Sequence, residues 1–280
     1  MSKKYKLTDE TVKVNGKTLY RIEALKDFNN VKRGDKGGFV ESELNLSQKG
    51  NCWIYNNAYV YDDACVSDNA RIANNAMIND NALISGHACI IENAKIYGNA
   101  RVFGDALIGG YTHIYDNAEV LDYVYVFCNA HIYGNARVSG NARVYNNAKV
   151  YDCAQVCANS NISNNARVFE NAKVYDNTRI YGNAKVCGNT VVFGEACIRG
   201  TAIVLDNTDY IVFKNWWSSG RYFTWTRSNN MWSVGCFYGT GEELIKKAYK
   251  DSELSGREYE RVVRYVESIL AEENPSKGTN

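Results

Sequence analysis

Three histidines, His87, His113 and His131, are the side chains of this sequence best suited by type to move a proton near neutral pH. A histidine works as a general base when a partner orients its ring and a pocket holds the substrate. No Ser/His/Asp order or paired-carboxylate motif accompanies them, and the segment GTGEEL lacks the lysine that a phosphate-binding loop needs. The histidines alone are therefore weak evidence for catalysis.

Nine cysteines are scattered along the chain without CxxC spacing. An odd, unpaired set disfavours both a disulfide framework and a zinc site, so we expect no metal and no cofactor. The first residues, MSKKYKLTDE, lack the apolar stretch of a signal peptide, and no apolar run approaches the ~18–20 residues of a membrane span. We therefore expect a cytoplasmic protein without a membrane partner.

The charge balance is close to neutral, with 32 Lys and Arg against 31 Asp and Glu. A neutral chain has no global field that would recruit a polyanion or an anionic membrane. Extended nucleic acid is accordingly an unlikely partner, although a small anionic ligand needs only a local site.

An internal repeat organises most of the chain. From Asn51 to Asp206 the sequence divides into 26 consecutive six-residue units, here called hexads, without insertion or deletion. The fourth position is Ile or Val in all 26, the second is Ala in 20, and the first is Asn in 18. The second position departs from Ala at Cys52, Thr112, Val124, Ser160, Thr178 and Thr190.

This repeat predicts short stacked strands. Residues two apart point to the same side of a strand, so positions 2 and 4 face one interior and positions 3 and 5 face outward. The Gly, Asp or Asn at position 6 and the Asn that follows it permit the turn between strands. Stacking equivalent hexads at about 4.8 Å buries the small core and lets Asn amides form ladders at the corners.

The spacing A-x-V-x-x-x-A-x-V over residues 51–206 resembles the hexapeptide-repeat proteins. That resemblance implies a left-handed parallel β-helix with three faces and about 18 residues per coil, and it favours a homotrimer. The left hand is implied by the resemblance only. Residues 34–58, GDKGGFVESELNLSQKGNCWIYNNA, look like the leader of bacterial and phage repeat proteins labelled acyltransferases, and the C-terminal GRYFTWTRSNNMWSVGCFYGTGEELIKKAYKDS is similar to end-pieces of phage-encoded repeat proteins.

The flanks complete an all-β solenoid with a β cap and a small α+β domain. Residues 1–50 form the cap, with Asn15-Gly16 as a tight hairpin turn. Residues 207–272 are expected to form three short antiparallel strands and two helices. Residues 273–280 are expected to be a frayed tail. Capping boxes are expected at Thr240/Glu243 and at Ser255/Glu258. The second helix shows an apolar stripe of Tyr259, Val262, Val263, Val266 and Leu270.

Taken three hexads per coil, one face segregates aromatic and basic side chains. We call it the Tyr/basic face, and its candidate ligand-binding residues are Tyr97, Tyr115, Tyr133, Tyr151, Lys95, His113, His131, Lys149 and Arg167. Two interpretations stay open. Stacked rings with basic neighbours stabilise a solenoid, and the same groups suit a nucleotide or another anionic planar ligand.

A second face carries a contiguous apolar strip over three coils, which is typical of an interface. Its outward residues are Cys89, Ile91, Leu107, Tyr125 and Phe127, with Gly109 between them. Self-association is the favoured explanation, and a flank folded over the strip is the alternative. In the C-terminal region Trp216, Trp217, Trp225 and Trp232 are expected to form a small core. A binding patch built with Arg221 is the alternative.

The function expected from these features is that of a non-enzymatic, oligomeric solenoid that binds or sequesters a ligand or a partner protein. The phage resemblance implies a counter-defence role in the host cytoplasm, directed at a nucleotide-type signal or a host protein. An acyl-CoA-dependent acyltransferase, implied by the hexapeptide resemblance, is the alternative, and a purely architectural repeat protein is the third.

Overall fold

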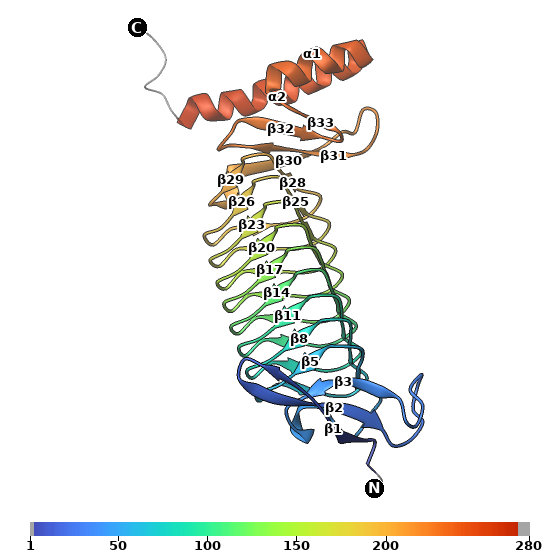
Figure 1. The fold of residues 1–280 in the computed structure, drawn as a ribbon. Coiled ribbons are helices and arrows are strands. Elements are labelled where there is room, and N and C mark those ends of the chain that lie inside the picture. Colours follow the sequence, from blue (N-terminus) through green and yellow to red (C-terminus); the bar gives the residue numbers. More distant parts are fainter. Residues whose placement is uncertain (1–2, 274–280) are drawn as a thin grey trace.

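The structure is a computed structural model that describes residues 3–273, so residues 274–280 of the predicted tail lie outside the described residues. It is a parallel β-solenoid with an antiparallel sheet and two helices at its C-terminal end (Figure 1). The 18-residue coil is confirmed, because equivalent strands pair one coil apart: His113 pairs with His131, and Leu107 with Tyr125. The hand of the helix stays a prediction.

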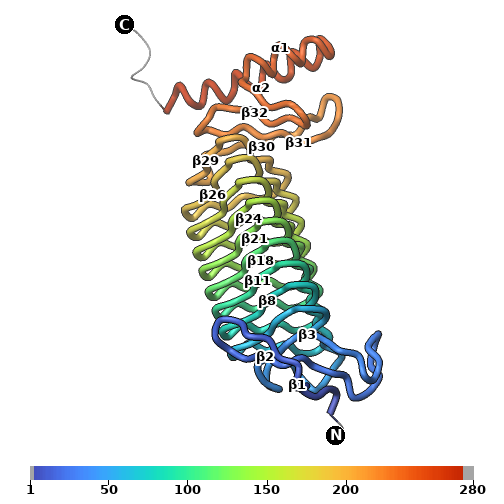
Figure 2. Tube along the Cα trace, in the orientation of Figure 1, coloured from blue at the N-terminus to red at the C-terminus, as the bar shows by residue number. Residues whose placement is uncertain are grey.

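The solenoid has three faces, each a parallel sheet of two-residue strands; the winding is clear in Figure 2. Face 1 is the Tyr/basic face, and its strands are β5 (Tyr59–Val60), β8 (Met77–Ile78), β11 (Lys95–Ile96), β14 (His113–Ile114), β17 (His131–Ile132), β20 (Lys149–Val150), β23 (Arg167–Val168), β26 (Lys185–Val186) and β29 (Ile203–Val204).

Face 2 carries the apolar strip. Its strands are β4 (Trp53–Ile54), β7 (Arg71–Ile72), β10 (Cys89–Ile90), β13 (Leu107–Ile108), β16 (Tyr125–Val126), β19 (Arg143–Val144), β22 (Asn161–Ile162), β25 (Arg179–Ile180) and β28 (Cys197–Ile198). Face 3 consists of β6 (Cys65–Val66), β9 (Leu83–Ile84), β12 (Arg101–Val102), β15 (Glu119–Val120), β18 (Arg137–Val138), β21 (Gln155–Val156), β24 (Lys173–Val174) and β27 (Val191–Val192).

The core is the column of Ala and Ile or Val side chains predicted from positions 2 and 4, all of which are fully buried. Four of the non-Ala residues at position 2 carry hydroxyl groups, and each donates a hydrogen bond to a carbonyl oxygen three residues earlier. The distances are 2.6 Å from Thr112 and Ser160 and 2.7 Å from Thr178 and Thr190. Each buried hydroxyl group therefore has a hydrogen-bond partner within its own turn, so a polar residue can replace Ala at position 2 without leaving an unpaired polar group in the core.

The corners contain the predicted amide ladders. One ladder runs from Asn81 through Asn99 and Asn117 to Asn135, and in it the Nδ2 of each of the first three donates to the Oδ1 of the next at 3.0–3.1 Å. Position 6 adopts positive φ, as at Gly98 and Asp116, which explains the preference for Gly, Asp and Asn there. Carboxylates at this position also accept from the backbone N–H one coil later, as Asp116 does from Gly134.

The N-terminal flank caps the solenoid by extending face 1. β1 (Tyr5–Val14) and β2 (Lys17–Ala24) form the predicted hairpin, whose two turn residues both have positive φ. β3 (Lys36–Val40) then pairs in parallel with β5, and the 3₁₀ helix η1 (Glu43–Asn45) follows. Parallel pairing therefore begins before the first hexad.

The C-terminal flank is a four-stranded antiparallel sheet between the last coil and two helices. After η2 (Asn207–Asp209) come β30 (Tyr210–Lys214), β31 (Tyr222–Thr226), β32 (Met231–Val234), β33 (Phe237–Gly239), α1 (Gly241–Asp251) and α2 (Glu253–Glu273). The prediction of three strands was wrong, because the turn at Gly235 and Cys236 divides the expected third strand into β32 and β33.

Helix packing follows the predicted apolar stripe. Tyr259, Val263 and Val266 are buried, and Val262 and Leu270 pack against the same core, which also contains Trp225 and Trp232. Trp217 packs at its edge, whereas Trp216 is 73% exposed. The capping box at Thr240/Glu243 is confirmed.

The second predicted capping box is wrong. Ser255 lies inside α2, and its N–H donates to the Oγ of Ser252 instead. Glu258 forms an ion pair with Arg261.

Candidate ligand-binding face

The tyrosines of face 1 form one continuous stack. Tyr97, Tyr115, Tyr133, Tyr151 and Phe169 follow one another with ring centroids 4.8–5.0 Å apart and interplanar angles of 1–2°. Parallel rings at this centroid spacing are stacked on one another and leave no room for a further ring between them. The faces of Tyr115 and Tyr133 are covered on both sides, so a planar ligand cannot lie on them. The stack offers ring edges and hydroxyl groups instead.

Burial keeps these hydroxyl groups protonated. It raises the pKa of Tyr115 to about 12, and the neighbouring Tyr133, Tyr97 and Asp116 add to the effect. The pKa values of Tyr97, Tyr133 and Tyr151 are raised as well, again chiefly by burial. At neutral pH the row therefore presents neutral O–H donors.

The basic side chains form a parallel column on the same strands. Strand register places Lys95, His113, His131, Lys149 and Arg167 one after another. Lys185 extends the column, since it pairs with Arg167. The rings of His113 and His131 stack at 5.0 Å. All nine residues predicted for this face are thus brought onto one sheet, and Lys185 and Phe169 lengthen its two columns.

The cations of this column form no ion pairs within residues 3–273. In the part of the chain that the structure describes, no salt bridge involves Lys95, Lys149, Arg167 or Lys185. Face 3 differs, because Glu119 lies between Arg101 and Arg137 at 3.3 and 3.7 Å. Like charges on adjacent strands repel one another, and Lys149, Arg167 and Lys185 lie on three adjacent strands.

The two histidines respond to that charge. Burial, with Lys95 nearby, lowers the pKa of His113. Burial also lowers the pKa of His131, and His113 and Lys149 add to the effect. Both rings are therefore neutral at neutral pH.

Neither of these histidines has an orienting carboxylate among residues 3–273. His113 and His131 contact each other, and the ring of Tyr97 lies edge-on to His113 at 6.1 Å. His87 lies on another corner, where its Nε2 is 3.3 Å from Asn69 Nδ2. The three histidines are not brought together, and none of them is hydrogen-bonded to a carboxylate of residues 3–273.

A polar hollow borders the basic column. It has a volume of about 520 Å³ and lies along the corner that precedes face 1. Its lining includes Asn129, Asn147, Asn165 and Asn183, each two residues before a member of the column. These amides form a ladder at 3.1–3.4 Å in which each donating Nδ2 uses one of its two N–H groups. The hollow was missed in the sequence, although the Asn column that forms it was visible there.

The apolar strip of face 2 is partly packed within itself. The rings of Tyr125 and Phe127 stack at 4.2 Å, and the Phe127 ring and Ile91 occupy the space above Gly109, where a Cβ atom would lie only 2.5 Å from the ring. Tyr125 remains 40% exposed. The cap and the C-terminal sheet lie at the two ends of the solenoid (Figure 1), and β10, β13 and β16 lie in the middle of their sheet, so the covering-flank explanation is wrong for the described flanks.

The remaining chemistry-bearing groups lie apart. All nine cysteines are free thiols. Within the described residues, no three His, Cys, Asp or Glu side chains are grouped to hold a metal, and no helix has the length and apolarity to cross a membrane.

Comparison with known proteins matches the middle of the solenoid. A family model described as "YdcK Beta solenoid repeat" matches residues 94–110, 130–146 and 136–152. A protein of Escherichia coli (strain K12) named "Uncharacterized acetyltransferase YdcK" is 50% identical over 38 residues. That match spans 14% of this chain and 12% of the relative. These similarities agree with the predicted hexapeptide resemblance.

Proposed function

We propose that this β-solenoid repeat protein is non-enzymatic, that it binds an anionic ligand along the basic column of face 1, and that its subunits associate through face 2. The observation that carries the proposal is the column of unpaired cations. Lys95, Lys149, Arg167 and Lys185 share one face with two histidines and have no ion pair among the described residues, whereas Arg101 and Arg137 of face 3 are both paired with Glu119. An anion on this column relieves the repulsion between them.

The stacking of the tyrosine rings on one another restricts the class of ligand that face 1 can bind. A nucleotide base gains nothing from rings whose faces already stack on one another, so recognition falls to the phosphates. The free N–H groups of the Asn ladder and the cations beside it suit oxyanions spaced along the column. We therefore propose that the ligand presents phosphate groups to the column. A nucleotide signal would supply such groups, and an acidic segment of a host protein would imitate them with carboxylates.

We expect Lys149→Ala and Arg167→Ala each to weaken the binding of inorganic tripolyphosphate by about tenfold, the scale of one lost charge-assisted hydrogen bond. The loss should be larger at low ionic strength, because exposed charges are screened as salt rises. Isothermal titration calorimetry measures both. Arg143→Ala, which removes an exposed cation from face 2, is the matched control and should leave the affinity unchanged.

The same titrations test the role of the rings and of the histidines. ATP and tripolyphosphate should differ by less than about fivefold, because a stacking platform would add about 1–3 kcal/mol. Affinity should rise as pH falls from neutral toward 5.5, since a bound anion favours protonated His113 and His131, whose pKa values are lowered in the free protein. The proposal that the basic column binds the anion would be wrong if tripolyphosphate did not bind. It would also be wrong if Lys149→Ala, Arg167→Ala and Arg143→Ala lost affinity equally.

Self-association through face 2 is tested by adding charge to the strip. Leu107→Lys combined with Phe127→Lys should lower the sedimentation coefficient, because two ammonium groups would enter the contact. The trimer suggested by the hexapeptide resemblance would dissociate to monomers. The double variant Leu83→Lys and Phe193→Lys, which changes exposed apolar residues of face 3, is the control. An unchanged coefficient for the first variant would exclude this strip as the interface.

The proposed setting is a reducing cytoplasm, which the nine free thiols support. Sequestration of a signal or a host protein by a phage product would be one use of such a repeated surface. Its support is the resemblance of the two end segments to phage-encoded repeat proteins.

Acetyl transfer is the second candidate, and the name of the E. coli relative favours it. That candidate expects the wild-type protein to consume acetyl-CoA and to lose the activity when one histidine is changed, with ligand binding largely kept. Assays of CoA release on the wild type, His113→Ala and His131→Ala separate the two. Transfer that depends on a single histidine would overturn the non-enzymatic proposal.

A further inference from the structure

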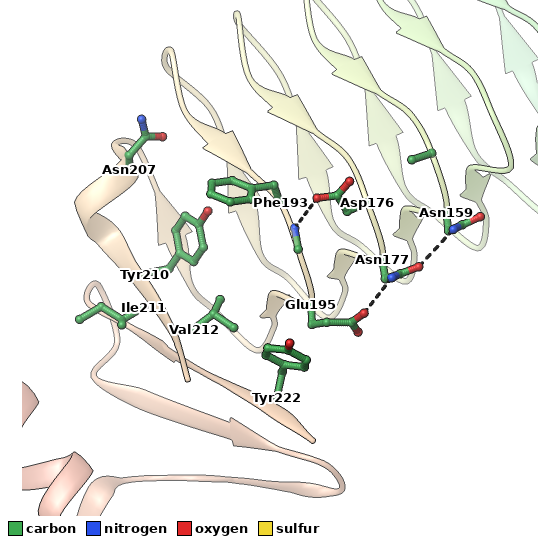
Figure 3. A pocket seen from close by; sticks show the side chains of 12 residues that line it. Asn159, Asp176, Asn177, Phe193, Glu195, Asn207, Tyr210, Ile211, Val212 and Tyr222 are labelled. Carbon is green, nitrogen blue, oxygen red and sulfur yellow. Dashed lines mark hydrogen bonds between the residues drawn. The ribbon is translucent and has the colours of Figure 1, made fainter. Parts of the chain in front are cut away.

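A second hollow, of about 810 Å³, lies where the last coils of the solenoid meet the C-terminal sheet. Figure 3 shows its two walls. The solenoid contributes Asp176, Phe193 and Glu195, and the C-terminal segment contributes Tyr210 and Tyr222. It is separate from the basic column of face 1, because Asp176 and Phe193 follow face 3 strands and Glu195 occupies the corner before face 2.

The charge of this hollow is negative. Among the described residues that line it, Asp176 and Glu195 are the charged ones, and none is Lys, Arg or His. Neither carboxylate takes part in a salt bridge among residues 3–273. Both are held in place: Asp176 Oδ2 accepts from the Gly194 N–H at 2.9 Å, and Glu195 Oε1 accepts from Asn177 Nδ2 at 2.7 Å. Each carboxylate keeps one oxygen free for a ligand.

Aromatic rings form the rest of the site. Phe193 is 52% exposed and Tyr222 is 43% exposed, although both line a concave surface. Phe193 is supported by Tyr175 at 5.7 Å, and the Tyr210 hydroxyl donates to the Val191 carbonyl at 3.0 Å. The Nζ of Lys214 lies 5.7 Å from the centroid of the Tyr222 ring, so this ring already carries one ammonium group. Aromatic faces beside carboxylates are the usual surroundings of organic cations.

We propose that this hollow binds a linear organic polyamine. Two fixed carboxylates match two ammonium groups, each of which donates three hydrogen bonds. The aromatic and aliphatic walls, which include Val212, cover the methylene chain between them. An inorganic cation fits less well, because two carboxylates on successive coils beside apolar walls offer fewer oxygens than Ca²⁺ requires. An anion is disfavoured by both carboxylates.

Spermidine is the probe that tests this site, by isothermal titration calorimetry on the full chain at low salt. The wild type should bind one spermidine per chain, and Glu195→Gln and Asp176→Asn should each weaken binding by at least about tenfold. Both substitutions keep an oxygen that can accept the existing hydrogen bond. Asp105→Asn is the matched control: it removes one negative charge from an exposed residue on the same corner as Glu195 and should leave the affinity unchanged.

A third variant tests the aromatic wall. Phe193→Leu retains an apolar side chain but removes the ring, and it should weaken spermidine several-fold. Melting temperatures near that of the wild type show which variants are folded, so at least one carboxylate variant remains interpretable. The absence of saturable spermidine binding would overturn the proposal, as would equal affinities in Glu195→Gln and Asp105→Asn. Neither outcome affects the anion site, whose residues lie on face 1.

Discussion

Val144→Asp should destabilise the protein by at least about 3 kcal/mol, because it places a carboxylate in a fully apolar interior without a partner. Val144 is completely buried on β19 and lies between Val126 and Ile162 of the neighbouring coils. An ionised group there would be desolvated by the Ala and Val columns on every side. Denaturant unfolding followed by circular dichroism measures the change.

Arg143→Asp is the control for that experiment. Arg143 precedes Val144 in the same two-residue strand, but its side chain is exposed. The same new carboxylate would remain in water, so the effect should stay within about 0.5–1 kcal/mol. Equal losses of stability in the two variants would contradict the alternation of inward and outward residues on which the core depends.

Trp53→Ala should cost about 3–5 kcal/mol, the range for removing a large buried aromatic side chain. Trp53 is at position 3 of the first hexad, where the repeat predicts an outward residue, yet it is 1% exposed. Tyr5 and Phe28 of the N-terminal flank pack edge-on against it, with centroids at 6.3 and 5.4 Å. The substitution would leave a cavity between the cap and the first coil.

Arg71→Ala is the matched change one coil later. Arg71 pairs with Trp53 in strand register, occupies the same position of its hexad and is exposed. Its substitution should change stability by less than about 1 kcal/mol. A small effect of Trp53→Ala would show that the cap contributes little to the stability of the solenoid.

Much of the solenoid followed from the sequence because its contacts repeat. Val144 lies in register with Val126 and Ile162, which are 18 positions away and are also β-branched aliphatic residues, so a pattern that repeats along the chain also repeats in the core. The same logic placed Tyr97 beside Tyr115 and Lys149 beside Arg167. The candidate face could therefore be named residue by residue before its structure was known.

The chemistry of that face depended on details that no period contains. Ring planes within 2° of parallel show that the tyrosines cover one another. The row therefore offers hydroxyl groups to a ligand, and not the ring faces that the sequence suggested. Within the described part of the chain, the basic column of face 1 has no ion pairs, whereas Glu119 of face 3 lies between two arginines, and this difference depends on which rotamers reach one another. Side-chain direction and partner choice are set by packing in three dimensions.

The sequence by itself determined the six-residue repeat and the identity of the inward residues, since both arise within one hexad, whereas the 18-residue coil was implied by the resemblance to hexapeptide-repeat proteins. The tertiary structure alone decided how the ends close. Lys4 is buried and donates to the Cys52 carbonyl 48 positions away, and the Cys197 N–H donates to Thr224 Oγ1 across 27 positions. Such contacts join non-repeating flanks to a repeating column, so no regular spacing in the sequence predicts which residues will meet. The hollow between Glu195 and Tyr222 exists for the same reason, because its two walls meet only after the C-terminal sheet has docked on the last coil.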